Sequence, residues 1–392
     1  MTEPAFPLDL TRHFSRFREA AAGRLHFAAH SHHFWPDVTR EAQIRCWDDA
    51  ARLADDKWDE VLGPVWRRVS EGIARHLNLP SPDSLALAPN THEFVNRLLS
   101  CCEPGRTVRI LTSDGEFHSF RRQTQRLAEE GLVELVIVAA EPFDSFAARL
   151  VAAGREAGRI DLVFVSQVLF NSGFALTDLA GLVDGLAAPQ RLVVIDGYHG
   201  FMARPTDLSA IADRAFYLAG GYKYAMGGEG ICFLHSPPGL APRPRDTGWY
   251  AAFGALAGRQ DEVAYAESGW RFMGATFDPS GLYRFDAVLA WMAEHGIDAG
   301  VAQAHSRALQ EMFVAGLPEL RHPVLDPANL VVPGEDKRGN FLTFRHEQAG
   351  ECYRALHRDG IVTDIRGDRL RVGFGLYHKA ADVAALLARL RG

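Results

Sequence analysis

Short apolar segments alternate with longer amphipathic segments between about residues 85 and 235, and this alternation constrains the fold most strongly. Strands joined by helical crossovers form a parallel sheet that is covered on both faces. The run at 231–235 follows a glycine-rich stretch closely enough to be a hairpin partner, so we expect one antiparallel strand. The sequence predicts an α/β fold, and its five further strand candidates lie at 108–112, 132–138, 160–166, 191–196 and 216–220.

The segments after this region predict a second, smaller α+β domain. The proline-rich segment 236–248 breaks the alternation, and a long helical region at about 281–316 is expected to connect the two halves as one continuous helix. Strand and helix patterns then resume, including a single strand at 361–365. We expect three parts: an N-terminal arm that joins the small domain and the active-site mouth (1–45), a large domain (46–280) and a small C-terminal domain (281–392).

Charge and cysteine content narrow the function classes. The 392 residues carry a formal net charge of −7 without a basic stripe, which argues against nucleic acid as a partner. Five scattered cysteines without a CxxC pair indicate neither a disulfide framework nor a zinc ribbon. No apolar run of about 18 residues and no signal-peptide core occur, so we expect a cytoplasmic protein without a membrane partner. A dinucleotide-binding oxidoreductase would need a GxGxxG turn after the first strand, which is absent.

Two polar residues stand where predicted strands end. Asp196 closes one strand and Lys223 follows another, and open α/β sheets bind ligands at such carboxyl ends. Alone, Asp196 is more simply a turn cap and Lys223 a solvated surface group. Together they suit pyridoxal phosphate, because a buried lysine loses its proton readily and a carboxylate keeps a pyridine nitrogen protonated.

The other needs of that cofactor also have candidates. Thr91 follows Asn90 at the start of an amphipathic helix, where a hydroxyl and free amides can hold a phosphate. The alternative for Thr91 is an ordinary helix cap. Phe117 or His118, beyond a strand end, could stack on the pyridine ring, and a core phenylalanine is the alternative.

The order of six motifs resembles a known family. They are NTHEFVN, EFHSF, SQVLFNSG, DGYHGF, GGYKY and LRVGFGLYHKAADV, and the similarity covers about residues 25–392. This order resembles the class V aminotransferase family of fold-type I pyridoxal-phosphate-dependent enzymes, and within it the kynureninase branch. The resemblance implies a pyridoxal 5'-phosphate cofactor, an amino-acid substrate and a homodimer with shared active sites. It also implies a large domain with a mostly parallel, seven-stranded type of sheet and a small α+β C-terminal domain.

The resemblance assigns roles to single residues. Lys223 matches the lysine that links to the cofactor, Asp196 the partner of the pyridine nitrogen, and His199 the histidine three residues later. Phe117 matches the stacking ring, in preference to His118. The other matches are Asn90, Thr91 and Tyr222 at the phosphate, Trp249 at the cofactor site, Thr276 on the loop that reaches a neighbouring subunit's phosphate, and Arg371 at the substrate α-carboxylate. A surface ion pair is the alternative for Arg371.

Some positions depart from the family pattern. Gly220 and Tyr222 stand where a serine and a histidine are frequent. Gln167 replaces a histidine, and it can hydrogen-bond the cofactor's phenolic oxygen but cannot titrate there. Residues 318–345 contain no cysteine and Cys352 lies in a predicted helix, which disfavours a cysteine desulfurase of the usual kind.

Three histidines lie close together in the N-terminal arm: His30, His32 and His33. Their spacing is not that of a recognised zinc motif, and no cysteine or carboxylate partner is near in sequence, so we expect no metal. We expect His30 and His32 to face an aromatic or acidic substrate at the active-site mouth.

The resemblance leads to a mechanism in which the substrate amine displaces Lys223, which then moves the Cα proton. We expect kynureninase-like cleavage or elimination in the side chain. Transfer of the amino group to a keto acid is the alternative, since the first half-reaction is shared. A non-catalytic binding protein would be indicated only if Lys223 formed no link to the cofactor. Which amino acid is the substrate stays open.

Overall fold

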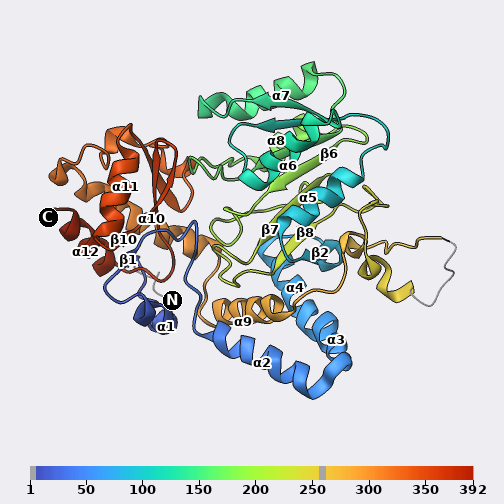
Figure 1. The fold of residues 1–392 in the computed structure, drawn as a ribbon, viewed down its shortest axis with the longest axis horizontal. Helices are drawn as coiled ribbons and strands as arrows, with labels where there is room; N and C mark the ends of the chain where they lie inside the picture. Colours follow the sequence, from blue (N-terminus) through green and yellow to red (C-terminus); the bar gives the residue numbers. More distant parts are fainter. Residues whose placement is uncertain (1–5, 256–261, 392) are drawn as a thin grey trace.

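The computed structural model describes residues 6–255 and 262–391. Figure 1 shows a large body built around a central sheet and a smaller body that holds the C-terminus. The N-terminal segment runs along the smaller body before the chain enters the larger one.

The central sheet has seven strands in the order β2-β8-β7-β6-β5-β3-β4. All neighbouring strands are parallel except β8, which is antiparallel to both β7 and β2. The mostly parallel sheet and its antiparallel strand are therefore confirmed, whereas β2 had no separate prediction. The strands are β2 (Leu85–Ala88), β3 (Val108–Ser113), β4 (Val133–Val138), β5 (Leu162–Ser166), β6 (Leu192–Asp196), β7 (Ala215–Gly220) and β8 (Cys232–His235).

Helices cover both faces of this sheet (Figure 1). Their apolar faces and the central strands form one hydrophobic core. Burial on both faces explains why β5, β6 and β7 are uninterrupted apolar runs. In chain order, the α-helices up to residue 294 are α1 (Ser15–Ala20), α2 (Val38–Leu53), α3 (Lys57–Glu60), α4 (Trp66–Leu77), α5 (Thr91–Ser100), α6 (His118–Glu129), α7 (Phe146–Glu156), α8 (Leu179–Leu186) and α9 (Ser280–Glu294).

The region predicted as one continuous helix at 281–316 is two helices, so that prediction is wrong. Gly296 has a φ of 63° and follows the end of α9, a conformation that stops a helix. Asp298 then caps α10 (Ala299–Gly316) by accepting a hydrogen bond from the Val301 amide at 2.8 Å. Residues of α9 pack in the first core, and α10 contributes Ala302 to that core but Leu309 and Phe313 to a second, so we propose that the domain boundary lies near the start of α10.

The small body contains a three-stranded antiparallel sheet in the order β11-β12-β9. The predicted single strand at 361–365 is two strands in different sheets, because β10 pairs in parallel with β1 of the N-terminal arm. The arm is thus tied to this body. Its elements are β1 (Leu25–His26), β9 (Phe341–Arg345), α11 (Ala349–Arg358), β10 (Ile361–Val362), β11 (Asp364–Arg366), β12 (Arg369–Gly373) and α12 (Ala380–Leu390).

Among the helices of the described ranges, none combines the length and the apolar character needed to cross a membrane.

Candidate active site

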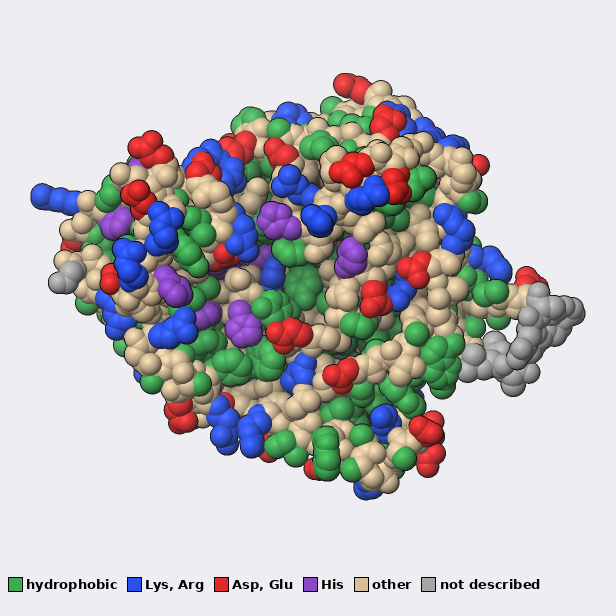
Figure 2. Space-filling view, in the orientation of Figure 1, with side chains coloured by type: hydrophobic (Ala, Val, Ile, Leu, Met, Phe, Trp, Pro, Cys, Tyr) green, Lys and Arg blue, Asp and Glu red, His purple; other side chains and the backbone are tan. Residues whose placement is uncertain are grey.

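A cavity of about 670 Å³ lies where the carboxyl ends of β5, β6 and β7 face the small body. Figure 2 shows a hollow between the two bodies, with histidine side chains around it. Nine residues predicted from the sequence line this cavity: His30, Asn90, Thr91, Phe117, Asp196, His199, Tyr222, Lys223 and Arg371. Segments that are more than 300 positions apart in the chain therefore meet at one site.

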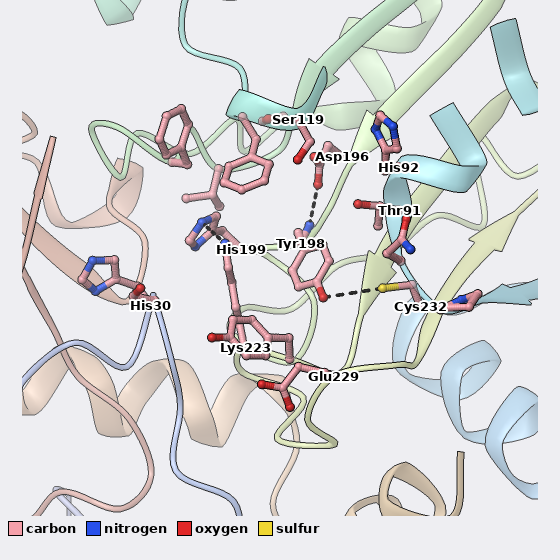
Figure 3. A pocket seen from close by; sticks show the side chains of 18 of the residues that line it. His30, Thr91, His92, Ser119, Asp196, Tyr198, His199, Lys223, Glu229 and Cys232 are labelled. Carbon is pink, nitrogen blue, oxygen red and sulfur yellow. Dashed lines mark hydrogen bonds between the residues drawn. The ribbon is translucent and has the colours of Figure 1, made fainter. Parts of the chain in front are cut away.

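Lys223 follows β7 and points into the cavity (Figure 3). Its Nζ atom lies 2.5 Å from Nε2 of His199. Burial lowers the pKa of Lys223 from its ordinary value, and the charge of Arg371 adds to this effect while Asp196 opposes it. Burial, followed by the charge of Lys223, holds the pKa of His199 well below its ordinary value. A neutral imidazole can therefore accept a hydrogen bond from the lysine, whose free amine is accessible closer to neutral pH than usual.

Asp196 is the last residue of β6, on the strand next to the one that leads to Lys223. Its Oδ1 accepts a hydrogen bond from the Tyr198 amide at 2.9 Å. Burial raises the pKa of Asp196, against the opposing effects of that hydrogen bond and of Lys223. A carboxylate in this position is stabilised by any cation that enters the cavity.

Tyr198 and Cys232 also line the cavity, although no sequence prediction included them. The Tyr198 hydroxyl lies 3.5 Å from Cys232 Sγ, and its ring centroid lies 5.2 Å from Lys223 Nζ. A Cβ atom on Gly220 would lie 2.3 Å from that sulfur and 2.7 Å from that hydroxyl. Gly220 thus leaves the space that Tyr198 fills. The sequence signal that could have identified Tyr198 was its position two residues after Asp196.

The N-terminus of α5 opens into the cavity on the side of Lys223 opposite to His30 (Figure 3). Asn90 caps this helix by accepting a hydrogen bond from the Glu93 amide at 3.1 Å. The alternative that Thr91 is the helix cap is therefore wrong, and Thr91 is the first helical residue. His92, which had no prediction, also lines the cavity. A helix N-terminus and a hydroxyl together form a site suited to a phosphate.

Phe117 and His118 were alternatives for a stacking ring. Phe117 lines the cavity, and its ring centroid lies 5.4 Å from Lys223 Nζ. Both rings pack edge-on against Phe170, but His118 is not part of the cavity wall. This arrangement favours Phe117.

Arg371 on β12 is buried, so the alternative of a surface ion pair is wrong. Its Nη2 donates to Asp364, and its Nη1 donates to the Phe170 carbonyl. Burial alone would raise the pKa of Asp364, but the nearby His30, with Nε2 3.6 Å away, and the charges of Arg371 and Arg366 hold it below its ordinary range. Arg371 thus has a fixed internal counter-ion.

The three arm histidines have separate environments. His30 is buried, lines the cavity and stacks on Phe341 at 4.5 Å between centroids. His32 is outside the cavity wall, with Nδ1 3.3 Å from the Tyr222 hydroxyl. His33 is structural, since it donates to the Phe34 carbonyl at 2.6 Å and accepts from the Leu376 amide. Across residues 6–255 and 262–391, no group of three or more His, Cys, Asp or Glu side chains is arranged to hold a metal ion.

Gln167, Trp249 and Thr276 do not line the cavity of this chain. The Gln167 side chain donates to Thr206 at 2.8 Å and accepts from the Tyr217 hydroxyl at 2.9 Å, so its amide is engaged outside the cavity wall. Trp249 is 43% exposed and stacks on a neighbouring tyrosine. Thr276 is exposed.

Glu116 is a buried carboxyl group next to the site that no prediction included. Its two oxygens accept hydrogen bonds of 2.5 Å from the hydroxyls of Ser113 and Ser166. Ser166 lines the cavity and lies in register with Asp196. Burial raises the pKa of Glu116 to about 8, against the effect of these hydrogen bonds.

Comparisons with known proteins agree with this geometry. The profile of the family Aminotransferase class-V matches residues 65–386. The chain is 32% identical to isopenicillin N epimerase of Streptomyces clavuligerus over 208 residues, which cover 52% of this chain and 51% of that protein. It is 28% identical to kynureninase of Geobacillus thermodenitrificans over 234 residues, which cover 54% and 49%. The chain thus spans about half the length of the curated relatives it matches.

Solved structures support the predicted fold. The complex between the cystine C-S lyase C-DES and its reaction product cysteine persulfide superposes with a TM-score of 0.82 at 19% identity. The match covers 95% of this chain and 98% of that one. At this identity the comparison shows the fold, and the prediction of fold type I is confirmed.

The cofactor of this fold family is pyridoxal 5'-phosphate, and the cavity residues fit it. A lysine amine with a lowered pKa, a carboxylate on the adjacent strand and a helix N-terminus are the groups it requires. Buried nitrogens of His92, His199 and Arg371 have no hydrogen-bond partner among the described residues, as expected where a polar group binds. The chain belongs to the class-V aminotransferase family, whose members are pyridoxal-phosphate-dependent enzymes.

Proposed function

We propose that the protein cleaves the side chain of an amino-acid substrate, as a kynureninase-like hydrolase or lyase. The observation that carries this proposal is the placement of Lys223, Asp196 and Arg371 around one cavity. These are a nucleophilic amine, a carboxylate for a ring nitrogen and a guanidinium for a carboxylate. The similarity to a kynureninase supports the side-chain reaction.

The phosphate end and the ring position of the cavity have separate residues. When bound, pyridoxal phosphate supplies an aldehyde that links to amines and a ring that withdraws electrons. Thr91 and the N-terminus of α5 would hold its phosphate, with Asn90 fixing the helix start. Tyr222 adds a hydroxyl to the cavity wall, and Phe117 would provide a ring surface for the cofactor.

Proton transfer falls to Lys223 and Asp196. With the cofactor bound, Asp196 would keep a proton on the ring nitrogen. Lys223 would carry the cofactor, and its Nζ, once free, would remove the proton from the substrate Cα. His199 accepts a hydrogen bond from Nζ and so keeps the amine oriented.

The substrate end contains Arg371 and His30. Arg371 binds the α-carboxylate. His30 presents a neutral ring to the substrate side chain, because burial lowers its pKa to about 3 and its nitrogens lack hydrogen-bond partners among the described residues.

The cysteines do not support the thiol chemistry of a usual cysteine desulfurase. Cys352 lies on α11 with its sulfur 3.7 Å from Nε2 of His322, in the small body. Cys232 reaches the cavity, but burial raises its pKa to about 12. A thiolate nucleophile therefore has no support among the described residues.

We also propose a homodimer with shared active sites. Trp249 and Thr276 lie outside the cavity of their own chain, and both are exposed enough to reach a second copy. In that arrangement they complete the partner's site.

The proposal is tested by incubating the purified, cofactor-loaded protein with kynurenine, 3-hydroxykynurenine and the common amino acids. Release of anthranilate, alanine or another side-chain product without an added keto acid supports it. The family profile also favours amino transfer as an alternative. Turnover that strictly depends on added pyruvate or glyoxylate would establish that alternative and overturn side-chain cleavage.

A further inference from the structure

Strands β11 and β12 bring two arginines to the same end of the cavity. Arg366 ends β11, and Arg371 on β12 lies in register with Asp364. Both arginine side chains line the cavity. His30, whose Nε2 lies 3.6 Å from Asp364, is on one side of Lys223 in Figure 3, with Thr91 on the other. The arginine pair is therefore at the end away from α5.

One carboxylate serves both guanidinium groups. Asp364 Oδ1 accepts from Arg366 Nη1 at 2.6 Å, and Asp364 Oδ2 accepts from Arg371. A guanidinium has five N–H donors. The Nε atoms of both arginines are buried and have no partner among the described residues. Each arginine therefore keeps donors that a ligand can satisfy.

The two arginines differ in how they meet the cavity. A guanidinium fork can hold a carboxylate through two parallel hydrogen bonds, so each arginine can bind an anionic group of its own. Arg371, with a side chain 3% exposed, takes the α-carboxylate in the proposed function. Arg366 is 37% exposed and faces the same cavity, so a group farther from Cα can reach it from the open side.

The surroundings of Arg366 do not offer a second internal anion at the cavity. Asp364 is already shared, and His30 is neutral. Glu229 also lines the cavity. After burial, its charge is the next influence on the pKa of Tyr222 and of His32, so Glu229 lies close to those two side chains. Asp196, another acidic side chain of the cavity wall, lies on the Thr91 side of Lys223, away from His30 (Figure 3).

We propose that the substrate is an amino acid with a second anionic group, and that Arg366 binds this group while Arg371 binds the α-carboxylate. The proposal rests on the proposed function, because it needs a cofactor-bound amino acid in this cavity. Arg366 is then the residue that determines specificity for an acidic side chain.

The test measures equilibrium binding to the cofactor-loaded protein from the change in cofactor absorbance. Three pairs of amino acids are compared, each an acid with a neutral analogue of matched chain length: aspartate with 2-aminobutyrate, glutamate with norvaline, and 2-aminoadipate with norleucine. The variants are Arg366→Gln, Arg366→Lys and, as a matched control, Arg345→Gln. Arg345 pairs with Glu141 on the same sheet but outside the cavity wall.

We expect at least one acid to bind the parent about tenfold or more tightly than its neutral analogue, as a charge-assisted hydrogen bond implies. Arg366→Gln should remove this preference and leave neutral amino acids unchanged, Arg366→Lys should restore part of it, and Arg345→Gln should leave it intact. Equal affinities for acids and analogues in the parent would overturn the proposal, as would an equal loss for both classes in Arg366→Gln. If no amino acid changes the absorbance of the bound cofactor, the proposed function itself fails.

Discussion

At the scale of single residues, burial gives two neighbouring carboxyl groups different tasks. Asp196 reaches the cavity, where a protonated ring nitrogen can stabilise its charge. Glu116 contacts the hydroxyls of Ser113 and Ser166, which only partly offset the cost of burying a charge. Burial raises the pKa of both groups. We infer that Glu116 is neutral around pH 7, whereas Asp196, whose pKa burial raises only to about 6, is ionised there.

The neutral state of Glu116 predicts a pH-dependent effect of Glu116→Gln on stability. The pKa of Glu116 rises from 4.5 to about 8 on folding, so between these values the folded protein holds a proton that the unfolded chain has lost. This group therefore lowers the free energy of unfolding as pH rises from about 4.5 to 8, by up to about 1.4 kcal/mol per pH unit. Glutamine does not titrate, so the variant should gain stability relative to the parent across this range.

Urea unfolding at a series of pH values measures this difference, with Glu129→Gln on the exposed side of α6 as the control. A stability difference between Glu116→Gln and the parent that stays constant from pH 5 to 8 would contradict a neutral Glu116.

Asp196→Asn removes the charge at the ring nitrogen while keeping the size of the side chain and its acceptor for the Tyr198 amide. We expect the variant to bind cofactor but to turn over substrate about 10²- to 10³-fold more slowly, the usual cost of losing one electrostatic contact in the transition state. Cofactor content by absorbance and initial rates measure the two effects. Turnover within a few-fold of the parent would be inconsistent with the role given to Asp196.

At the scale of elements, two helix N-termini with similar caps allow a matched comparison. Asn90 caps α5, which opens into the cavity, and Asp298 caps α10, which begins elsewhere. Replacing either residue with alanine should lower the free energy of unfolding by about 1 kcal/mol. Only Asn90→Ala should also weaken cofactor binding severalfold, as measured by fluorescence titration of the two apoproteins. Equal cofactor affinities in the two variants would show that the N-terminus of α5 does not bind the phosphate.

The sequence predicts elements well where their patterns are local. Parallel strands β3, β5, β6 and β7 are buried apolar runs, and their ends indicated Asp196 and Lys223. The break between α9 and α10 was missed, because the apolar pattern continues on both sides of Gly296. Strands β10 and β11 were predicted as one, because β10 is defined by a partner more than 300 residues earlier.

Site residues defined by distant contacts were beyond sequence reasoning. The orientation of Gln167 depends on Thr206 and Tyr217, which come from other segments. The shared counter-ion of Arg366 and Arg371 likewise depends on the pairing of β11 with β12.

At the scale of the whole molecule, the surface of α2 supports the proposed dimer. Ile44 and Trp47 lie three positions apart on this helix, on the same face, and are 41% and 71% exposed, so together they form a small apolar patch. If α2 lies in the proposed dimer interface, Trp47→Arg should convert the dimer to a monomer in light scattering, because it would place a charge there. Leu132→Arg, at a position that is 52% exposed beside β4, should leave the mass unchanged. A parent protein that is monomeric at working concentrations would refute the shared-site arrangement.

The most direct test of the central role of Lys223 is to identify the lysine that carries the cofactor. The chain has four lysines, Lys57, Lys223, Lys337 and Lys379, of which Lys223 lines the cavity. After borohydride reduction and proteolysis, mass spectrometry should find the cofactor on the Lys223 peptide alone. The modification should disappear in Lys223→Ala and persist in Lys337→Ala, whose lysine pairs with Asp144 on the surface. Cofactor on another lysine, or none on Lys223, would contradict the assignment of this cavity as the active site.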